Sequence, residues 1–503
     1  MSFHFIPVST RITVLFLASL VWCALNSCAS REKKGQRLAE KYCSSCHIFP
    51  DPGLLSKEVW EKNVLPEMAI RMAIEFPGPG QFSKEDLEAL VSSIPKSPMV
   101  TKREWQMISD YYVASAPYEL VTESVTHNDT LLPFNVEKFR LPGGRDGTGT
   151  MLTMDPVANK LYYGTRDSFL HVFSPDLKIL YEVPLNSPLA AVLPRSDGLR
   201  LLTMGIMDPN DQPLGQLLMR KEDGEISILI DSLKRPVSFE AADLNNDGLD
   251  DYVICAFGHY TGELLAFEQT KNGSYKKHIL QQLPGSRKVV IQDFDQNGLP
   301  DIIALMTQGD ERIVMFHNLG NFRFRITTLL RFPPVYGSSY FEIHDFNGDG
   351  KFDILYSNGD NADYSMILKP YHGVRIFLND GTNRFNEHWF YPMPGASKAI
   401  AQDFDMDGDL DIAAISFFPD FTNPENGFMY FENNDGKFTP KVTPQAASGR
   451  WLIMEAADLD NNGSTDLILG ALNFNILAPR ELILQWEQDP VAFLILRNQV
   501  INH

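Results

Sequence analysis

The feature that most constrains the fold of this 503-residue chain is a nine-residue motif that occurs five times. Each copy follows the pattern Asp-x-Asp/Asn-x-Asp/Asn-Gly-x-x-Asp and leads into a short apolar stretch, such as residues 302–306. The copies start at residues 243, 293, 345, 403 and 458, so successive starts lie 50, 52, 58 and 55 residues apart. A near-constant period of this length indicates a repeat architecture and suits a four-stranded propeller blade.

Two further units precede the five and keep the rhythm of short strands and turns without the aspartate motif. They span residues 147–185 and 188–233. Seven units predict a mainly β fold, a seven-bladed β-propeller over residues 132–503, with no helix in this part. The chain ends soon after residues 491–496, the expected third strand of the last blade. We therefore expect residues 134–141 to supply its fourth strand and close the ring, which removes exposed sheet edges.

The aspartate motif places oxygen-bearing side chains at alternate positions, with a glycine where the chain turns sharply. Hard cations require such ligands, and Ca²⁺ matches them best. An EF-hand loop would need a glutamate at position twelve and flanking helices. Position twelve is instead occupied by Ile254, Ala304, Tyr356, Ala414 and Leu469, each in an expected strand. The EF-hand is excluded, and the remaining alternative is that the motifs are plain Asp/Gly turns.

The five loops resemble the FG-GAP/VCBS repeats of integrin-type propellers, in which each loop binds one calcium ion. The resemblance implies up to five Ca²⁺ ions, held by side chains at positions 1, 3, 5 and 9 and by the backbone carbonyl at position 7. The residues at these positions are Asp243, Asn245, Asp247, Leu249, Asp251; Asp293, Asp295, Asn297, Leu299, Asp301; Asp345, Asn347, Asp349, Lys351, Asp353; Asp403, Asp405, Asp407, Asp409, Asp411; and Asp458, Asp460, Asn462, Ser464, Asp466. The ions are expected to be structural, because without them like charges crowd each turn. They would also offset half of the net charge of −20.

A second motif lies near the N-terminus, where Cys43 and Cys46 enclose two serines and His47 follows directly. The pattern Cys-x-x-Cys-His is typical of covalent attachment of a c-type haem, in which the thiols bind the vinyl groups and the histidine ligates the iron. A zinc ribbon would need a second cysteine pair, and a thioredoxin-like site would need a βαβ context. The sequence therefore predicts one covalent haem c.

Residues 31–96 resemble a small class I cytochrome c, with a helix running into the motif, a methionine-bearing segment and a closing helix. We expect helices over residues 31–46 and 56–74, the latter kinked at Pro66, and a third helix capped by Ser83. Met68 is the expected sixth iron ligand, with Met72, Met99 or an open position as alternatives. The haem domain is assigned to residues 28–96 and a linker to residues 97–131.

The first 27 residues are interpreted as a lipoprotein signal peptide. A lone Arg11 precedes an apolar run over residues 12–25, and the segment ending at Cys28 resembles a lipobox. Cys28 would then carry the lipid and hold the protein at a membrane of the bacterial cell envelope. The alternatives are an ordinary signal peptide or an N-terminal anchor helix. Once Cys23 leaves with the signal, only Cys255 remains, so no disulfide is expected.

Two long loops of the expected fifth and sixth blades, over residues 357–372 and 416–425, combine aromatic and acidic groups. The groups suited to acid–base chemistry are Asp360, Asp363, His372 and Asp420. These loops would either line a site for a small molecule or saccharide, or simply pack against one another.

The function expected from the sequence is that of an envelope-anchored c-type cytochrome that exchanges electrons with a redox partner protein, with the propeller as its platform. A haem-dependent dehydrogenase, which would be an oxidoreductase, and a propeller that binds or cleaves polysaccharide are the alternatives. Lysines and arginines number 44 against 64 acidic residues. This balance argues against a nucleic-acid partner, because binding phosphates requires a basic face.

Overall fold

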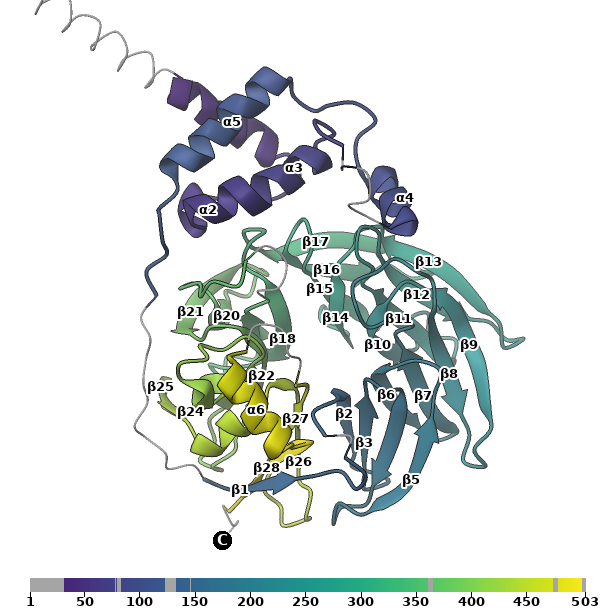
Figure 1. The fold of residues 1–503 in the computed structure, drawn as a ribbon. Coiled ribbons are helices and arrows are strands. Elements are labelled where there is room, and N and C mark those ends of the chain that lie inside the picture. Colours follow the sequence, from purple (N-terminus) through teal and green to yellow (C-terminus); the bar gives the residue numbers. More distant parts are fainter. Residues whose placement is uncertain are drawn as a thin grey trace, which may run out of the picture. The chain divides into compact units, whose positions relative to one another are not determined.

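The computed structural model describes residues 31–76, 78, 83–122, 133–144, 146–360, 365–473 and 478–499. The chain divides into two compact units, one helical and one built mainly of strands (Figure 1). The helical unit contains the described residues up to 78 together with 94–120, and the second unit contains 83–93 and the described residues from 121 onward.

The second unit is a propeller of seven four-stranded sheets (Figure 1), as the repeats predict. Blades 1 to 3 are formed by β2 (Gly149–Asp155), β3 (Lys160–Thr165), β4 (Phe169–Phe173) and β5 (Ile179–Pro184); β6 (Leu189–Arg195), β7 (Gly198–Thr203), β8 (Gly215–Arg220) and β9 (Ile226–Leu233); and β10 (Pro236–Ala242), β11 (Asp251–Ala256), β12 (Glu263–Gln269) and β13 (Tyr275–Gln281). Blades 4 to 6 are formed by β14 (Ser286–Gln292), β15 (Asp301–Met306), β16 (Arg312–Asn318) and β17 (Phe324–Arg331); β18 (Ser338–His344), β19 (Asp353–Asn358), β20 (Gly373–Asn379) and β21 (Phe385–Pro392); and β22 (Ala396–Gln402), β23 (Asp411–Ser416), β24 (Phe428–Asn434) and β25 (Lys437–Lys441). The two units without the aspartate motif are thus blades 1 and 2.

The seventh blade joins the two ends of the propeller and confirms the predicted closure. It consists of β26 (Trp451–Ala457), β27 (Asp466–Ala471), β28 (Phe493–Asn498) and β1 (Phe134–Phe139). β1 runs antiparallel to β28, in a register that pairs Phe134 with Asn498 and Phe139 with Phe493. Its outer strand therefore comes from the part of the chain that precedes blade 1.

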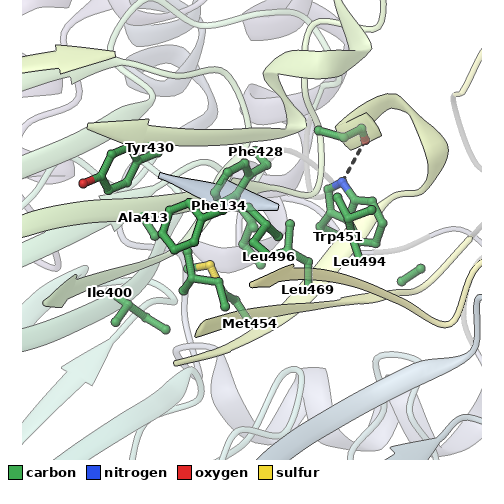
Figure 2. Close-up of a cluster of buried hydrophobic side chains, with 14 of the residues drawn as sticks. Phe134, Ile400, Ala413, Phe428, Tyr430, Trp451, Met454, Leu469, Leu494 and Leu496 are labelled. Atoms are coloured by element: carbon green, nitrogen blue, oxygen red, sulfur yellow. Dashed lines mark hydrogen bonds between the residues drawn. The ribbon is translucent and has the colours of Figure 1, made fainter. Parts of the chain in front are cut away.

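The hydrophobic core lies between successive blades. One cluster takes Ala413 and Tyr430 from blade 6 and Leu469 and Leu494 from blade 7, and Phe134 of the closing strand packs into it (Figure 2). The middle strands β11, β15, β19, β23 and β27 are buried along their whole length. Such continuous apolar strands are expected where a sheet is covered on both faces.

The prediction that the propeller has no helix is wrong. An α-helix, α6 (Arg480–Gln488), follows Pro479 in the connection from β27 to β28. Its Trp486 is buried, and the indole N–H donates to the carbonyl of Ala447 at 3.0 Å. The short helices η3 (Pro424–Gly427) and η4 (Pro444–Ser448) lie in other connections, and α4 (Lys84–Ser93), the helix predicted after Ser83, groups with this unit.

The helical unit begins with a helix whose described part covers residues 31–43. The predicted second helix is formed by α2 (Lys57–Val59), a turn of π-helix η2 (Trp60–Val64) and α3 (Leu65–Arg71), so the irregular turn precedes Pro66, which lies in the first turn of α3. A short helix, η1 (Pro52–Leu54), comes before them.

The predicted linker over residues 97–131 is wrong for its first half, because α5 (Lys102–Ser115) lies there. A capping box begins this helix: the Thr101 side chain accepts from the Glu104 N–H at 3.2 Å, and the Glu104 carboxylate accepts from the Thr101 N–H at 3.0 Å. The helix buries Met107, Ile108, Tyr111 and Tyr112. The helical unit therefore extends to residue 120, beyond the boundary predicted at residue 96.

The first helix crosses α5 closely at Gly35. A Cβ at Gly35 would lie 2.2 Å from the carbonyl oxygen of Met107, so only glycine fits. Beyond the crossing, the ring of Tyr112 lies 4.4 Å from that of Trp60, and its hydroxyl donates to the carbonyl of Pro50 at 2.9 Å. These contacts pack α5 against the segment that follows the Cys-x-x-Cys-His motif.

Candidate functional site

The Cys-x-x-Cys-His motif lies where the first helix ends, with Cys43 as its last helical residue and a turn over residues 44–46. None of Cys43, Cys46 and Cys255 forms a disulfide. Cys46 is exposed and Cys43 is half-buried, whereas Cys255 is fully buried in the propeller. Burial raises the pKa of Cys43 to about 11, so its thiol is protonated at neutral pH.

His47 follows the turn with an oriented ring. Its Nδ1 lies 2.8 Å from the carbonyl oxygen of Ile48, and because a carbonyl only accepts, Nδ1 must carry the proton. The lone pair then lies on Nε2, the nitrogen that a haem-ligating histidine presents to iron. A hydrogen bond from the other ring nitrogen is the usual device that fixes tautomer and orientation in metal-binding histidines.

The methionines considered for the sixth iron ligand differ in their surroundings. Met72 is buried in a small core cluster with Ala69, and Met99 and Tyr42, the neighbour of Cys43, pack against that cluster. The Met99 N–H donates to the Met72 carbonyl at 3.1 Å. Met68 lies on α3 half-buried and outside the cluster, so its assignment as the ligand stays a prediction.

The five aspartate loops occupy equivalent places in blades 3 to 7, each joining the first strand to the second. In all five, the position-1 carboxylate accepts the N–H of the position-6 glycine, at distances of 2.7 to 3.1 Å. The position-9 carboxylate accepts the position-2 N–H at 2.9 to 3.2 Å. The motif thus folds into one repeated loop in which these two carboxylates are oriented by the backbone.

Positions 4 and 6 of each loop have left-handed backbone conformations. At position 6 the glycines have φ between 78° and 103°, which explains why this residue is the same in all copies. At position 4 Asn246, Asn461 and Gly348 tolerate φ of 56° to 70°, and Gln296 and Met406 adopt similar values. In the blade 6 loop, the ligand atoms of positions 1, 3 and 5 lie within 4.8 Å of one another.

The loop carboxylates are crowded. Burial and the neighbouring carboxylates raise the pKa values of Asp251 and Asp405 to about 6. The pKa values of Asp301, Asp353, Asp409, Asp411 and Asp466 are also raised, first of all by burial. At three loops, ligand atoms lie within 4.8 Å of one another, and His317 of the third strand belongs to the first of these groups. The groups are Asp295, Asp301 and His317; Asp403, Asp405 and Asp407; and Asp458, Asp460 and Asp466. A cation would relieve this repulsion.

The two long loops do not gather the expected acid–base groups on an open surface. His372 is fully buried, and burial lowers its pKa well below the usual value. Asp420 is 8% exposed and accepts hydrogen bonds from the Thr422 N–H and hydroxyl of its own loop. Asp360 is half-buried, and Asp363 lies outside the described residues. His372 and Asp420, two of the expected acid–base groups, are therefore buried rather than displayed at the surface.

One buried carboxyl group was missed in the sequence. Glu311 lies just before β16 and is 2% exposed; it accepts from the Ser338 N–H at 2.8 Å and from the Gly337 N–H at 3.1 Å. Burial raises its pKa to about 7. The residue ties blade 4 to the start of blade 5, and nothing in its local sequence distinguishes it from a surface glutamate.

Comparison with known proteins finds one family model that matches the repeats. The family described as FG-GAP-like repeat matches residues 243–304, 293–356 and 403–469, which together contain all five aspartate loops. Solved structures that resemble the chain include the Neurospora crassa Pan2 WD40 domain, with 12% identity, a TM-score of 0.41 and coverage of 71% of this chain and 92% of that one. Another is Saccharomyces cerevisiae Sqt1, with 10% identity, a TM-score of 0.44 and coverage of 75% and 100%. No curated protein sequence matches.

No helix among the described residues is long and apolar enough to cross a membrane. Cys28, the predicted lipid attachment site, lies outside the described residues.

The family match and the sheet topology together show that the chain contains FG-GAP-like repeats within a seven-bladed propeller, which could serve as a platform for binding.

Proposed function

We propose that this protein is a c-type cytochrome that transfers electrons, attached by a lipid on Cys28 to the bacterial cell envelope. Its propeller would bind up to five Ca²⁺ ions and serve as the platform for a redox partner protein or another ligand. The observation that carries the proposal is that the Cys43–His47 segment combines two cysteine thiols with an oriented histidine ring. Two thiols outside any disulfide flank a helix end, and the next side chain is a histidine whose Nδ1 donates to a carbonyl.

These residues fit a covalent haem in their chemistry. Cys43 and Cys46 would form the thioether bonds, and His47 would present Nε2 as an axial ligand. When bound, the haem supplies reversible one-electron redox chemistry. The Ile48 carbonyl would hold the His47 ring in place through the Nδ1 proton. A methionine as sixth ligand would raise the reduction potential and favour electron transfer, with Met68 as the first candidate and Met72 as the second.

The test is production of the full chain in a bacterial periplasm equipped for haem attachment, followed by pyridine haemochrome spectra and haem staining of a denaturing gel. We expect one covalent haem per chain, lost in the double variant Cys43→Ala/Cys46→Ala. The matched control is Cys255→Ala, which removes the remaining described thiol and should leave haem content unchanged. A folded wild-type chain without covalent haem would overturn the proposal.

Function and ligation are tested on the same preparation. A redox titration gives the potential, and the red charge-transfer band of a sulfur–iron bond should vanish in Met68→Leu and persist in Met72→Leu if Met68 is the ligand. Reduction of the haem by sugars or alcohols, with no partner protein present, would instead identify a dehydrogenase. Elemental analysis of the purified protein tests the calcium, with a count of up to five Ca²⁺ per chain expected.

A further inference from the structure

The aspartate loop of blade 4 differs from the other four in the residue that approaches it from the third strand. In each of blades 3 to 7, a third-strand backbone N–H donates to the position-9 carboxylate at 2.7 or 2.8 Å. These hydrogen bonds define one equivalent place in all five blades. The residues just before the donors are Glu268, His317, Leu378, Glu432 and Arg497.

At the other four places the side chain is either held in an ion pair or carries no metal-binding atom. Glu268 is engaged by Lys276 at 3.0 Å and by His278 at 2.8 Å, and Glu432 by Lys441 at 2.8 Å. Arg497 is itself a cation and lies 3.5 Å from Asp466 of its loop. Leu378 is apolar and packs against the core between blades 5 and 6.

His317 is different because its ring faces the loop with a nitrogen that nothing satisfies. The residue is 5% exposed, and its Nδ1 makes no hydrogen bond within the described part of the chain. This atom lies 3.8 Å from a carboxylate oxygen of Asp295, which is beyond hydrogen-bonding distance. Ligand atoms of His317, Asp295 and the fully buried Asp301 all lie within 4.8 Å of one another. A buried polar atom without a partner costs stability unless a ligand satisfies it.

We infer that the blade 4 loop binds a first-row transition-metal ion, Zn²⁺ or a close neighbour, rather than Ca²⁺. The inference rests on the proposal that the aspartate loops bind cations. Calcium takes oxygen ligands, whereas one imidazole and two carboxylates are a donor set that suits zinc and similar metals. Asp295 lies on the exposed side of the loop, where water would complete the coordination.

The carboxylates retain the capacity to bind such an ion. Each oxygen of Asp301 accepts one backbone N–H, from Phe294 at 3.2 Å and from Asn318 at 2.7 Å. Because a carboxylate has about four acceptor positions, at least one more remains for a metal. The hydrogen bonds also fix the carboxylate, so that a small movement of His317 and Asp295 would complete the site.

The experiment is titration of the metal-stripped full-length protein with Co²⁺ in the presence of excess Ca²⁺, followed by elemental analysis of the bound metal, X-ray absorption at the cobalt edge and then displacement with Zn²⁺. We expect one equivalent of Co²⁺ to bind, with nitrogen and oxygen ligands that include an imidazole. The variant His317→Leu copies the residue found at the equivalent place in blade 5 and should lose that equivalent while keeping the calcium count of the other loops. Position 3 of the blade 5 loop is Asn347, so the reciprocal double variant Leu378→His/Asn347→Asp, which supplies the imidazole and both carboxylates, should gain a second equivalent.

The outcomes separate this inference from the proposal beneath it. Five bound Ca²⁺ ions with no Co²⁺ or Zn²⁺ retained would overturn the inference and leave the calcium loops standing. Unchanged Co²⁺ binding in His317→Leu, with the protein folded by circular dichroism, would also overturn it. Absence of binding of either kind of metal would overturn both.

Discussion

Removal of the Phe134 side chain from the closing strand tests how strongly β1 holds the ring shut. Phe134 is 7% exposed, and its ring forms a T-shaped contact with the ring of Tyr430, at 5.5 Å between centroids (Figure 2). A second T-shaped contact joins it to the ring of Phe404 at 5.8 Å. Truncation of a buried phenylalanine to alanine typically costs about 3–5 kcal/mol, through lost transfer energy and the cavity left behind. The backbone pairs between β1 and β28 stay intact in Phe134→Ala, so we expect a loss of that size without a change of fold.

The measurement is guanidinium unfolding followed by tryptophan fluorescence, because Trp451 lies in the same buried cluster as Phe134. Hydrogen exchange should accelerate in residues 134–139 and 493–498 and stay unchanged in β15, which belongs to blade 4. Asn135→Ala is the matched control, since Asn135 is the next residue on β1 and is exposed. A loss below about 1 kcal/mol for Phe134→Ala, or equal losses for both variants, would refute the view that this ring anchors the closure.

Three further predictions concern the helical unit, a buried carboxyl group and the aspartate loops. Thr101→Ala removes the side-chain acceptor of the Glu104 N–H and should destabilise α5 by about 1 kcal/mol. Thr101→Ser keeps a hydroxyl acceptor and should retain the stability of the wild type in thermal unfolding. Equal melting points for both variants would contradict the capping role. Because burial raises the folded-state pKa of Glu311 from 4.5 to about 7, its stabilising contribution is complete below pH about 4.5 and is lost as the pH rises through 7. The difference in free energy of unfolding between wild type and Glu311→Gln, measured by calorimetry at fixed calcium, should therefore move against the wild type between pH 5 and 8, by roughly 3 kcal/mol at most. A difference that stays constant over this range would contradict the burial of the ionised group. Asp251 and Asp405 also have raised pKa values, about 6, so the melting temperature of chelator-treated protein should fall as the pH rises from 5 to 7.5. Saturating Ca²⁺ should remove the part of this fall that comes from the two carboxylates. Plots of melting temperature against pH that stay parallel with and without Ca²⁺ would argue against cations in the loops.

The sequence predicted the propeller well because its repeats are local and regular. The spacing of the motifs defined five blades, and the strand rhythm of residues 147–233 predicted blades 1 and 2 without any motif. The closing strand followed from counting, since the seventh unit contained three expected strands and a blade needs four. In each case the information lay within one repeat or in the number of repeats.

The errors arose where local signals competed or where contacts depend on register. The capping box at Thr101 and Glu104 is readable in the sequence, but nearby prolines and a polar stretch outweighed it in favour of a linker. α6 was missed because it interrupts the strand rhythm of the last blade after its second strand. The approach of His317 to the blade 4 loop depends on the pairing of β15 with β16, where Ile302 pairs with Phe316. His317 lies in β16, whereas the loop leads into β15, so no short sequence motif contains both.

The position-9 carboxylates explain why cation binding in the loops should act on whole blades. All five, Asp251, Asp301, Asp353, Asp411 and Asp466, are fully buried at the start of the second strand. Each accepts one N–H from its own loop and another from the third strand, so a single carboxylate joins the loop to two strands. In blades 1 and 2, tight turns between Asp155 and Lys160 and between Arg195 and Gly198 replace the loop. Because a buried charge needs compensation, a cation bound at the loop stabilises the carboxylate and, through it, the pairing of the strands. Loss of the cation is therefore expected to loosen blades 3 to 7 while blades 1 and 2 keep their protection from hydrogen exchange.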